Sequence, residues 1–194
     1  MAEQILDGKG TGKRAGVNEN NRLLTFAISE RLSVAAAENG ENYNVNTGSI
    51  TLTTANESAV LYVKNNEEKN FIIEDVIVIF GASTGGTGDL SIELIRNPTT
   101  GTIISGASDA DVVGNRNFGS SREFVADVYK GAEGNTLTNG DLFSDTTRST
   151  ASTVVHFDAD VIVLPKGTTL GVNITPQPSN TSMSVKVAVV GYLF

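Results

Sequence analysis

Cysteine and tryptophan are absent from this 194-residue chain, and His156 is its single histidine. Without cysteine the chain has no thiol nucleophile, no disulfide framework and no cysteine-ligated metal site. A domain of this length can bury roughly 70% of the surface that its unfolded chain exposes, so a hydrophobic core can stabilise it without such crosslinks. The absence of cysteine therefore excludes these three kinds of site, and it does not indicate in which cellular compartment the protein is found.

Long hydrophobic runs are also missing. The most apolar stretch, Phe71 to Phe80, contains Glu74 and Asp75, and it is far shorter than the ~20 residues that a membrane helix needs. Residues Met1 to Asp7 have neither the basic start nor the apolar core of a secretory signal. We therefore expect a soluble protein that is made in a cytoplasm and has no membrane partner.

What the chain does have is a two-residue alternation of apolar and polar side chains. Near the C-terminus Met183, Val185 and Val187 share one face of an extended chain, while Ser184 and Lys186 share the other. This period is typical of a strand with one buried face. Turn residues separate the alternating segments, and we predict strands at residues 23–27, 50–54, 59–63, 71–80, 90–97, 123–129, 154–164, 170–174 and 183–192.

Three local patterns add detail to this strand map. Residues 29–38 have apolar side chains at helical spacing and end at Asn39-Gly40, so we predict one short helix there. Residues 50–54 and 59–63 flank a polar turn and predict a hairpin. Residues 71–80 are almost continuously apolar, which predicts a central strand covered on both faces. Residues 98–122 and 130–150, rich in Gly, Asn, Ser and Thr, are expected to form long surface loops.

The strand map indicates an all-β fold with about eight or nine strands and no alternation of strands with helices. We predict an antiparallel jelly-roll-like β-sandwich with one short N-terminal helix and an extended N-terminal arm. An immunoglobulin-like sandwich is the competing fold, but its cysteine and tryptophan hallmarks are missing. The predicted division is an arm at residues 1–22 followed by a single domain at residues 23–194.

Charge is distributed unevenly between these two parts. Residues 1–22 carry four basic and three acidic side chains, whereas the remainder carries ten basic and nineteen acidic ones. An acidic body gains nothing from counterion release on phosphates, so we expect no direct binding of nucleic acid. The arm is rich in Gly and Asn and is expected to order only on a partner; a solvated terminus is the alternative. Its candidate partner-binding residues are Lys9, Lys13, Arg14 and Arg22.

The most site-like pattern is a run of ionisable residues along one predicted strand. His156, Asp158 and Asp160 alternate and therefore share a face. Such residues occur in metal sites and acid–base pairs. One histidine and two carboxylates make an incomplete ligand set, however, and the pattern favours the solvated face of an outer strand.

Other candidate sites are weaker still. Residues 8–14 depart from a phosphate-binding loop, which needs Gly where Asp7 stands and Ser or Thr where Arg14 stands. No Gly-x-Ser-x-Gly elbow is present for a serine nucleophile. Two acidic pairs in the predicted loops offer oxygen ligands for a hard cation, although surface solubility is the favoured explanation; these are Asp109 with Asp111 and Asp141 with Asp145. We therefore predict no catalytic residue, no metal ligand, no cofactor and no enzymatic activity.

Several segments, in order along nearly the whole chain, resemble a known group of proteins. They are residues 7–12, 20–23, 35–38, 43–48, 61–67, 116–121, 129–134 and 164–167. With these segments the chain resembles virion structural proteins of tailed bacteriophages. Because the shared segments carry no chemistry, the resemblance implies a place in the virion and a β-sandwich fold, and it assigns no site residues.

The resemblance favours a capsid decoration or cement protein, assembled in the bacterial cytoplasm and located in the virion. Its implied partners are the major capsid protein or other virion proteins, with a homo-oligomer, and a trimer in particular, as the favoured state. A tail, neck or fibre module that binds a host receptor or glycan is the alternative. That alternative needs exposed aromatic side chains, and the predicted loops offer only Phe118 and Phe143. A carbohydrate-active enzyme on the same fold would need a carboxylate pair across a groove.

Overall fold

A computed structural model describes residues 16–17, 23–24, 31–148 and 153–194. The chain divides into two compact units, residues 1–31 and residues 32–194. In the first unit β1 (Gly16–Val17) pairs antiparallel with β2 (Leu23–Leu24). The expected boundary between residues 22 and 23 stays a prediction.

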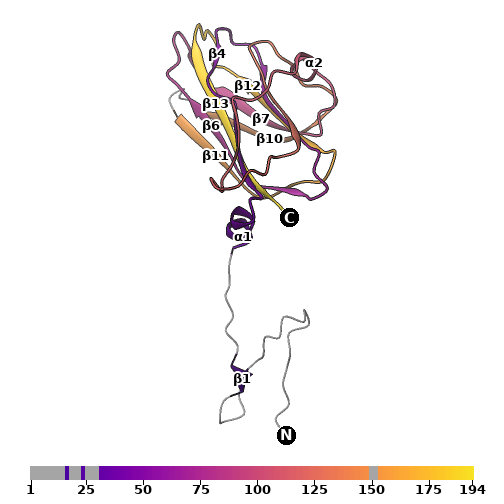
Figure 1. The fold of residues 1–194 in the computed structure, drawn as a ribbon. Coiled ribbons are helices and arrows are strands. Elements are labelled where there is room, and N and C mark those ends of the chain that lie inside the picture. The colour runs from indigo at the N-terminus through magenta and orange to yellow at the C-terminus, as the bar shows by residue number, and fades with distance from the viewer. Residues whose placement is uncertain (1–15, 18–22, 25–30, 149–152) are drawn as a thin grey trace. The chain divides into compact units, whose positions relative to one another are not determined.

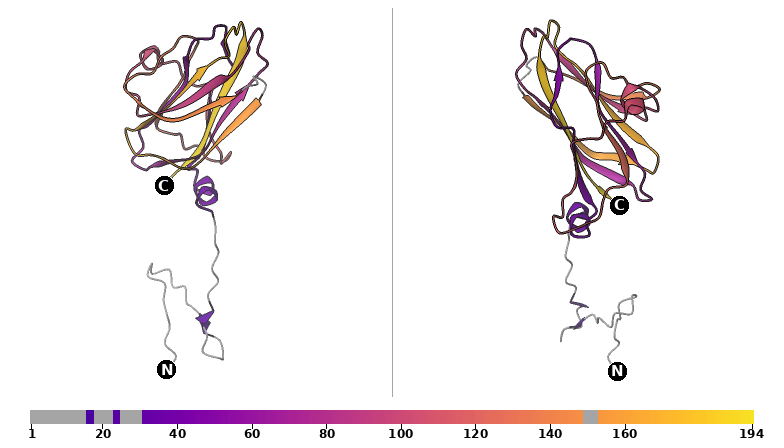
Figure 2. Two further views of the ribbon diagram at one scale, coloured as in Figure 1. Left: turned by 180° about the vertical axis from the view of Figure 1, so that it is seen from behind. Right: turned by 45° about the horizontal axis from the view of Figure 1, so that its top comes forward.

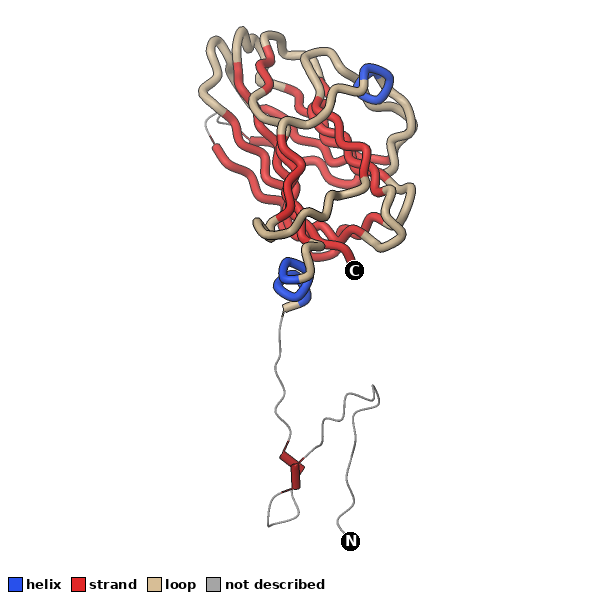
Figure 3. The backbone as a smooth tube through the Cα atoms, in the orientation of Figure 1, coloured by secondary structure: helices blue, strands red, loops and turns tan. Residues whose placement is uncertain are grey.

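The second unit consists mainly of strands joined by loops (Figure 3). Its two helices are α1 (Leu32–Glu38) and α2 (Thr102–Gly106). Its strands, within the described part of the chain, are β3 (Asn42–Asn46), β4 (Ile50–Leu52), β5 (Ser58–Asn65), β6 (Phe71–Phe80), β7 (Leu90–Arg96), β8 (Val112–Asn115), β9 (Ala126–Lys130), β10 (Asp141–Arg148), β11 (Thr153–Leu164), β12 (Thr169–Thr175) and β13 (Met183–Leu193).

These strands form two antiparallel sheets that face each other (Figures 1 and 2). One sheet has the order β10-β7-β12-β5-β9, and the other has the order β11-β6-β13-β3-β8 with β4 also paired to β13. The pairs are nested along the chain, since β7 pairs with β10, β6 with β11, β5 with β12 and β3 with β13. Such nesting, with successive strands in alternate sheets, is the jelly-roll topology. The predicted all-β antiparallel sandwich is confirmed.

The core lies between the two sheets and is built from the alternation visible in the sequence. On β13, Val185, Val187 and Val189 are fully buried, whereas Lys186 between them is exposed. Aromatic rings close one region of this core, where Phe124 lies 4.9 Å from the ring centre of Tyr43 and 4.6 Å from that of Phe71. Burial of apolar surface is the main favourable term in folding, so these inward rows hold the two sheets together.

The five-stranded sheet is also covered on its outer side, by the chain's own loops. Ile103 of α2 is buried against Ala59 and Tyr62 of β5, and Tyr62 stacks on Tyr129 with ring centres 5.7 Å apart. Residues on both sides of β5 are therefore buried. The outer side of the six-stranded sheet has no comparable second cluster among the described residues.

One carboxylate fixes the loop after β9 to the loop after β4. Glu133 accepts hydrogen bonds from the hydroxyl of Thr53 at 2.6 Å and from the backbone N–H groups of Thr53 and Thr54 at 2.8 and 2.6 Å. Hydrogen bonds from Thr53 and Thr54 favour the charged form and lower the pKa of Glu133 to about 2. The ionised carboxylate therefore acts as a clasp between two loops.

Several sequence predictions are corrected by the strand pairing. The predicted hairpin is wrong, because β4 pairs with β13 while β5 pairs with β12 and β9 in the other sheet. The segment between β4 and β5 thus crosses from one sheet to the other instead of turning within one. Strand β6 has the predicted bounds, but its outer side is not covered, since Ile79 is exposed.

The predicted loops contain regular elements that the pattern did not show. Residues 98–122 include α2 and β8, and residues 130–150 include β10. Strand β10 is at the edge of its sheet with most side chains exposed, so its residues show no alternation of apolar and polar types. The predicted helix at 29–38 is confirmed as α1 over its described part, and residues 25–30 lie outside the described residues.

Neither helix in the described part of the chain has the length and apolar character required to cross a bilayer.

The core assignment predicts a large difference between two phenylalanines. We expect Phe71→Ala, which removes a fully buried ring of β6, to lower the free energy of unfolding by about 3 to 5 kcal/mol. Phe118→Ala, which removes a fully exposed ring, serves as the matched control and should change it by less than about 0.5 kcal/mol. Denaturant unfolding measures both, and equal losses would contradict the assignment.

The Glu133 clasp predicts a pH dependence with a defined sign. Its pKa is about 2 in the folded chain against 4.5 for the ordinary value, so its stabilising effect is complete above about 4.5 and is lost as pH falls toward about 2. We expect Glu133→Gln to be less stable than the parent near neutral pH, with the difference shrinking across that window. Unfolding curves at a series of pH values measure this, and a difference independent of pH would refute it.

Candidate interaction surfaces

The outer side of the six-stranded sheet carries exposed apolar side chains beside charged ones, since Lys186 on β13 lies opposite Ile79 and Asp75 contacts His156 on the same side. Register places Val154 opposite Ile79, and Val163 opposite Ile72, where β11 pairs with β6. The side chains of Val154, Val163 and Ile79 are 51%, 43% and 38% exposed. We call this surface, with its further members Ile77 on β6, Val190 on β13 and Val112 on β8, the open face.

His156 lies within the open face and forms a hydrogen bond with Asp75. Its Nδ1 atom is 2.8 Å from Oδ2 of Asp75 on the neighbouring strand, and register places it opposite Ile77. Of the residues predicted to share its face, the side chains of Asp158 and Asp160 lie outside the described part of the structure. The structure thus gives His156 a partner, Asp75, which the sequence pattern did not indicate because it comes from another strand.

A surface hollow continues the open face toward β8. It has a volume of about 540 Å³ and is lined by Val112 and Val190, by Asn44 and Arg116, and by Phe118. The ring of Phe118 is fully exposed, although exposed aromatic rings are costly unless a partner covers them. This end of the face therefore combines an apolar floor with one aromatic and one cationic side chain.

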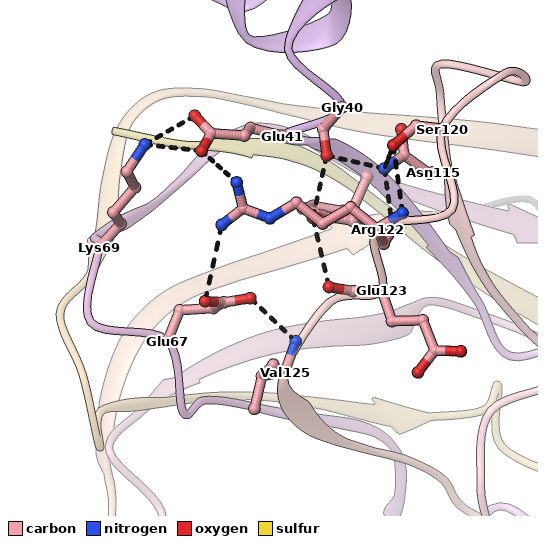
Figure 4. A network of polar contacts seen from close by, with 10 residues as sticks. Gly40, Glu41, Glu67, Lys69, Asn115, Ser120, Arg122, Glu123 and Val125 are labelled. Atoms are coloured by element: carbon pink, nitrogen blue, oxygen red, sulfur yellow. Dashed lines mark hydrogen bonds and ion pairs between the residues drawn. The ribbon is translucent and has the colours of Figure 1, made fainter.

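The loop that carries Phe118 is fixed by a polar network (Figure 4). Arg122 pairs with Glu41 and lies 3.9 Å from Glu67, and Lys69 donates to both oxygens of Glu41 at 2.7 and 2.8 Å. Nearby, Asn115 donates to the carbonyl of Gly40 at 2.7 Å. Residues that are distant in sequence thus hold the segment between β8 and β9 against the sheet.

Electrostatics favour the charged form of the network. Burial by itself raises the pKa of the Glu41 carboxyl, but the hydrogen bonds and charges of Lys69 and Arg122 outweigh this effect and keep its pKa below the ordinary value. Burial likewise lowers the pKa of Arg122, while Glu41 raises it above its usual range. Glu41 and Arg122 are therefore both ionised at neutral pH.

A second hollow is a groove between β10 and β11, which are edge strands of the two sheets. Its volume is about 270 Å³, and its apolar lining includes Phe143, Val163, Leu164 and Leu170. Phe143 occupies a register shift between Leu142 and Ser144, so it is the extra residue of a bulge on an edge strand. Bulges re-aim side chains, and both aromatic rings noted in the predicted loops, Phe118 and Phe143, are exposed.

The outer side of the five-stranded sheet carries an acidic row. Register places Glu93 between Asp145 and Asn173 on its two neighbouring strands, and Asn173 donates to Glu57 at 2.8 Å. Burial raises the pKa of Glu93, and the charges of Glu57 and Asp145 raise it further. The Oδ1 atom of Asn173 is buried without a hydrogen-bond partner.

The acidic pairs considered as cation ligands are divided among separate contacts. Asp111 pairs with Lys130, Asp141 pairs with Arg96 at 2.8 Å, and Asp145 accepts from the hydroxyl of Ser91 at 2.7 Å. Asp109 forms a β-bridge with Tyr129. Within residues 31–148 and 153–194, no group of three or more histidine or acidic side chains is arranged to hold a metal ion.

The arm residues proposed for partner binding, Lys9, Lys13, Arg14 and Arg22, lie outside the described residues. Their role stays a prediction. The open face and the Phe118 hollow were not predicted as sites. The signal for the open face was present, because ten nearly continuous apolar residues in β6 require cover on both sides.

Comparison with known proteins adds little to this geometry. No family model and no curated protein matches the chain. Among solved structures, a chain from the crystal structure of tomato aspermy virus is similar at 10% sequence identity with a TM-score of 0.34, over 88% of this chain and 82% of that one. At that TM-score the likeness carries no argument, and the fold assignment depends on the strand pairing alone.

The polar network predicts an effect of removing one charge. We expect Glu41→Gln to lower the free energy of unfolding by about 1 to 3 kcal/mol, because Arg122 and Lys69 lose a charged partner that is largely buried. Amide hydrogen exchange in residues 116–125 should become faster as the loop loosens.

The control for this variant is Glu68→Gln, which removes the carboxylate of a surface ion pair with Lys166. Exposed pairs contribute little, so we expect no measurable change in unfolding or exchange. An equal effect of the two variants would show that the network has no special part in holding the Phe118 loop.

Proposed function

We propose that this chain is a non-enzymatic structural protein of a tailed-bacteriophage virion, and within the virion a capsid decoration or cement protein. The observation that supports this proposal most is the open face, where Val154, Val163 and Ile79 remain exposed beside an otherwise well-packed core. Exposed apolar surface of this kind marks an interaction site. A protein that functions through such a surface needs shape and solubility, and it needs no reactive side chains.

The ionisable residues fit a binding role. His156 is paired with Asp75, and Asp111, Asp141 and Asp145 are held in separate ion pairs and hydrogen bonds. An acidic body favours a place on the outside of a particle, because packaged nucleic acid repels it. The jelly roll supplies a packed body whose two sheets end in the edge strands β10 and β9, and β11 and β8.

We further propose that the protein binds the major capsid protein as a homo-oligomer, with a trimer as the favoured state. Closed cyclic symmetry lets each copy present the same face to the next copy and leaves no unsatisfied end. The arm residues Lys9, Lys13, Arg14 and Arg22 would add contacts with an acidic neighbour.

Copy number tests this proposal directly. In virions purified from the phage that encodes the chain, quantitative mass spectrometry should find it in a number comparable to that of the major capsid protein. A number comparable to portal or tail-fibre proteins would contradict the decoration role and would favour the neck or tail. Absence from washed virions would contradict a structural role altogether, as would turnover of a substrate that depends on His156 or Asp75.

Phe118 favours one alternative function, a neck, tail or fibre module that binds a host receptor or glycan. Its exposed ring beside Arg116, above a hollow of about 540 Å³, resembles a platform for stacking a planar or sugar ring. A glycan array separates the two functions. Binding that is lost in Phe118→Ala would favour the receptor module, and an array without hits would favour the capsid role.

A further inference from the structure

Strand β6 is apolar on both sides, but the described chain covers only one of them. Its inward residues Ile73, Val76 and Val78 are fully buried, whereas Ile79 on the outer side is 38% exposed. Strand β5 in the opposite sheet has the same two-sided apolar character, and there α2 and its neighbouring loops supply the cover. The outer residues Ile77 and Ile79 of β6 have no such cover among the described residues, and Asp75 shares their side.

The uncovered region extends over neighbouring strands. The cross-strand pairs Val154–Ile79 and Val163–Ile72 continue it onto β11, while Val190 and Val112 carry it across to the Phe118 hollow. Apolar patches that span several strands are uncommon on monomers and mark interfaces. The open face therefore combines these apolar side chains with Lys186, which lies opposite Ile79, and suits an occupant that presents several apolar side chains.

Net charge distinguishes two parts of a second copy that could occupy the open face, its residues 1–31 and its residues 32–194. Residues 32–194 carry nine basic and eighteen acidic side chains, whereas residues 1–31 carry five basic and four acidic ones. Two bodies of strongly negative charge repel each other, but a weakly basic segment is attracted to an acidic body. The N-terminal segment is thus the better match for this molecule's surface.

The sequence of that segment has the required apolar character. Residues 23–28 read Leu-Leu-Thr-Phe-Ala-Ile without a charge, and Leu24, Phe26 and Ile28 share one side if the segment is extended. Of this segment the structure describes β1 and β2, each two residues long, and Leu24 belongs to β2.

The attachment point also favours this occupant. The segment joins the second unit at Leu32, the first residue of α1, and α1 packs against β3 and β13 of the six-stranded sheet. When copies associate in a closed ring, a neighbouring copy can supply this cover to every copy at once.

We propose that the open face binds residues 1–31 of a second copy of this chain, with Leu24, Phe26 and Ile28 covering Ile77, Ile79 and Val154. The inference builds on the multi-copy role proposed above and names the contact that would hold the copies together. Each copy then gives its N-terminal segment to one neighbour and receives the segment of another, which is a heterologous interface.

Photo-crosslinking of the full chain tests this contact. A photoreactive phenylalanine at position 79 is placed in unlabelled protein, which is mixed with ¹⁵N-labelled parent protein, irradiated and digested. We expect mass spectrometry to find position 79 joined to labelled peptides from residues 1–31. The same photoreactive residue at position 125, where Val125 is 56% exposed away from the open face, should give no such product.

Three results would overturn the inference. They are crosslinks from position 79 to residues 32–194 of the labelled copy, crosslinks only within one chain, and no crosslink at concentrations where light scattering shows an oligomer. A protein that is monomeric at every accessible concentration would overturn it as well.

A charge pair gives a second readout that does not depend on the probe. We expect Ile79→Asp or Phe26→Lys alone to weaken self-association at least about tenfold, and the double variant to recover part of it, because the new charges would meet. Val125→Lys is the control and should leave association unchanged, while thermal unfolding confirms that each variant folds. If each single variant weakens self-association and the double variant recovers none of it, the result contradicts direct contact between the two positions.

These assays use purified protein, so their failure is distinct from failure of the proposed function. Virion copy number as high as that of the capsid protein, without the crosslink, would reject the named contact and leave the decoration role standing. If the crosslink forms but the protein is absent from virions, the named contact stands and the decoration role is rejected.

Discussion

Burial of the inward side chains of β6 and β13 between two sheets is the constraint on which the rest of this structure depends. Strand β6 pairs with β11 and β13, and β13 also pairs with β3 and β4, so these two strands connect most of the six-stranded sheet. Their inward residues are fully buried against the opposite sheet. Because the nested pairs tie strands from both halves of the chain, the sandwich forms only when both halves are present.

The two outer sides of this sandwich differ in how far they are covered. Loops and α2 cover the five-stranded sheet, where Ile103 packs on Ala59 and Tyr62, while the open face of the six-stranded sheet keeps its valines and isoleucines exposed. A single fold thus has one outer side that its own loops cover and another on which apolar side chains stay exposed among the described residues. The polar network around Glu41 and Arg122 keeps the Phe118 loop in place beside that second side.

The ionisable groups of the described chain serve structure in every contact observed. Glu133 clasps two loops, Glu41 holds Arg122 and Lys69, and His156 pairs with Asp75. Contacts of this kind orient loops and limit their motion. The acidic row at Glu93 adds to the negative charge of the body, and like charges on neighbouring strands oppose close approach of another acidic body.

The sequence by itself determined the all-β class, the inward rows of the long strands, and the short helix α1. Each depends on local periodicity, which is visible in residues such as Met183 to Tyr192 because alternate side chains of a strand face opposite sides. Edge strand β10 was invisible for the same reason, since a strand exposed on both sides shows no alternation. The continuous apolar run of β6 indicated a need for cover on both sides, but it could not indicate that one cover would be missing.

Only the tertiary structure decided which strands pair, that β4 and β5 lie in different sheets, and that Asp75 meets His156. It also decided which apolar side chains remain at the surface, such as Val154 beside Ile79. These are contacts between residues far apart along the chain, and a local pattern carries no information about its partner. The physical reason is that the alternation of apolar and polar residues indicates which side of a strand is buried. The packing of the whole chain decides which residues that side contacts.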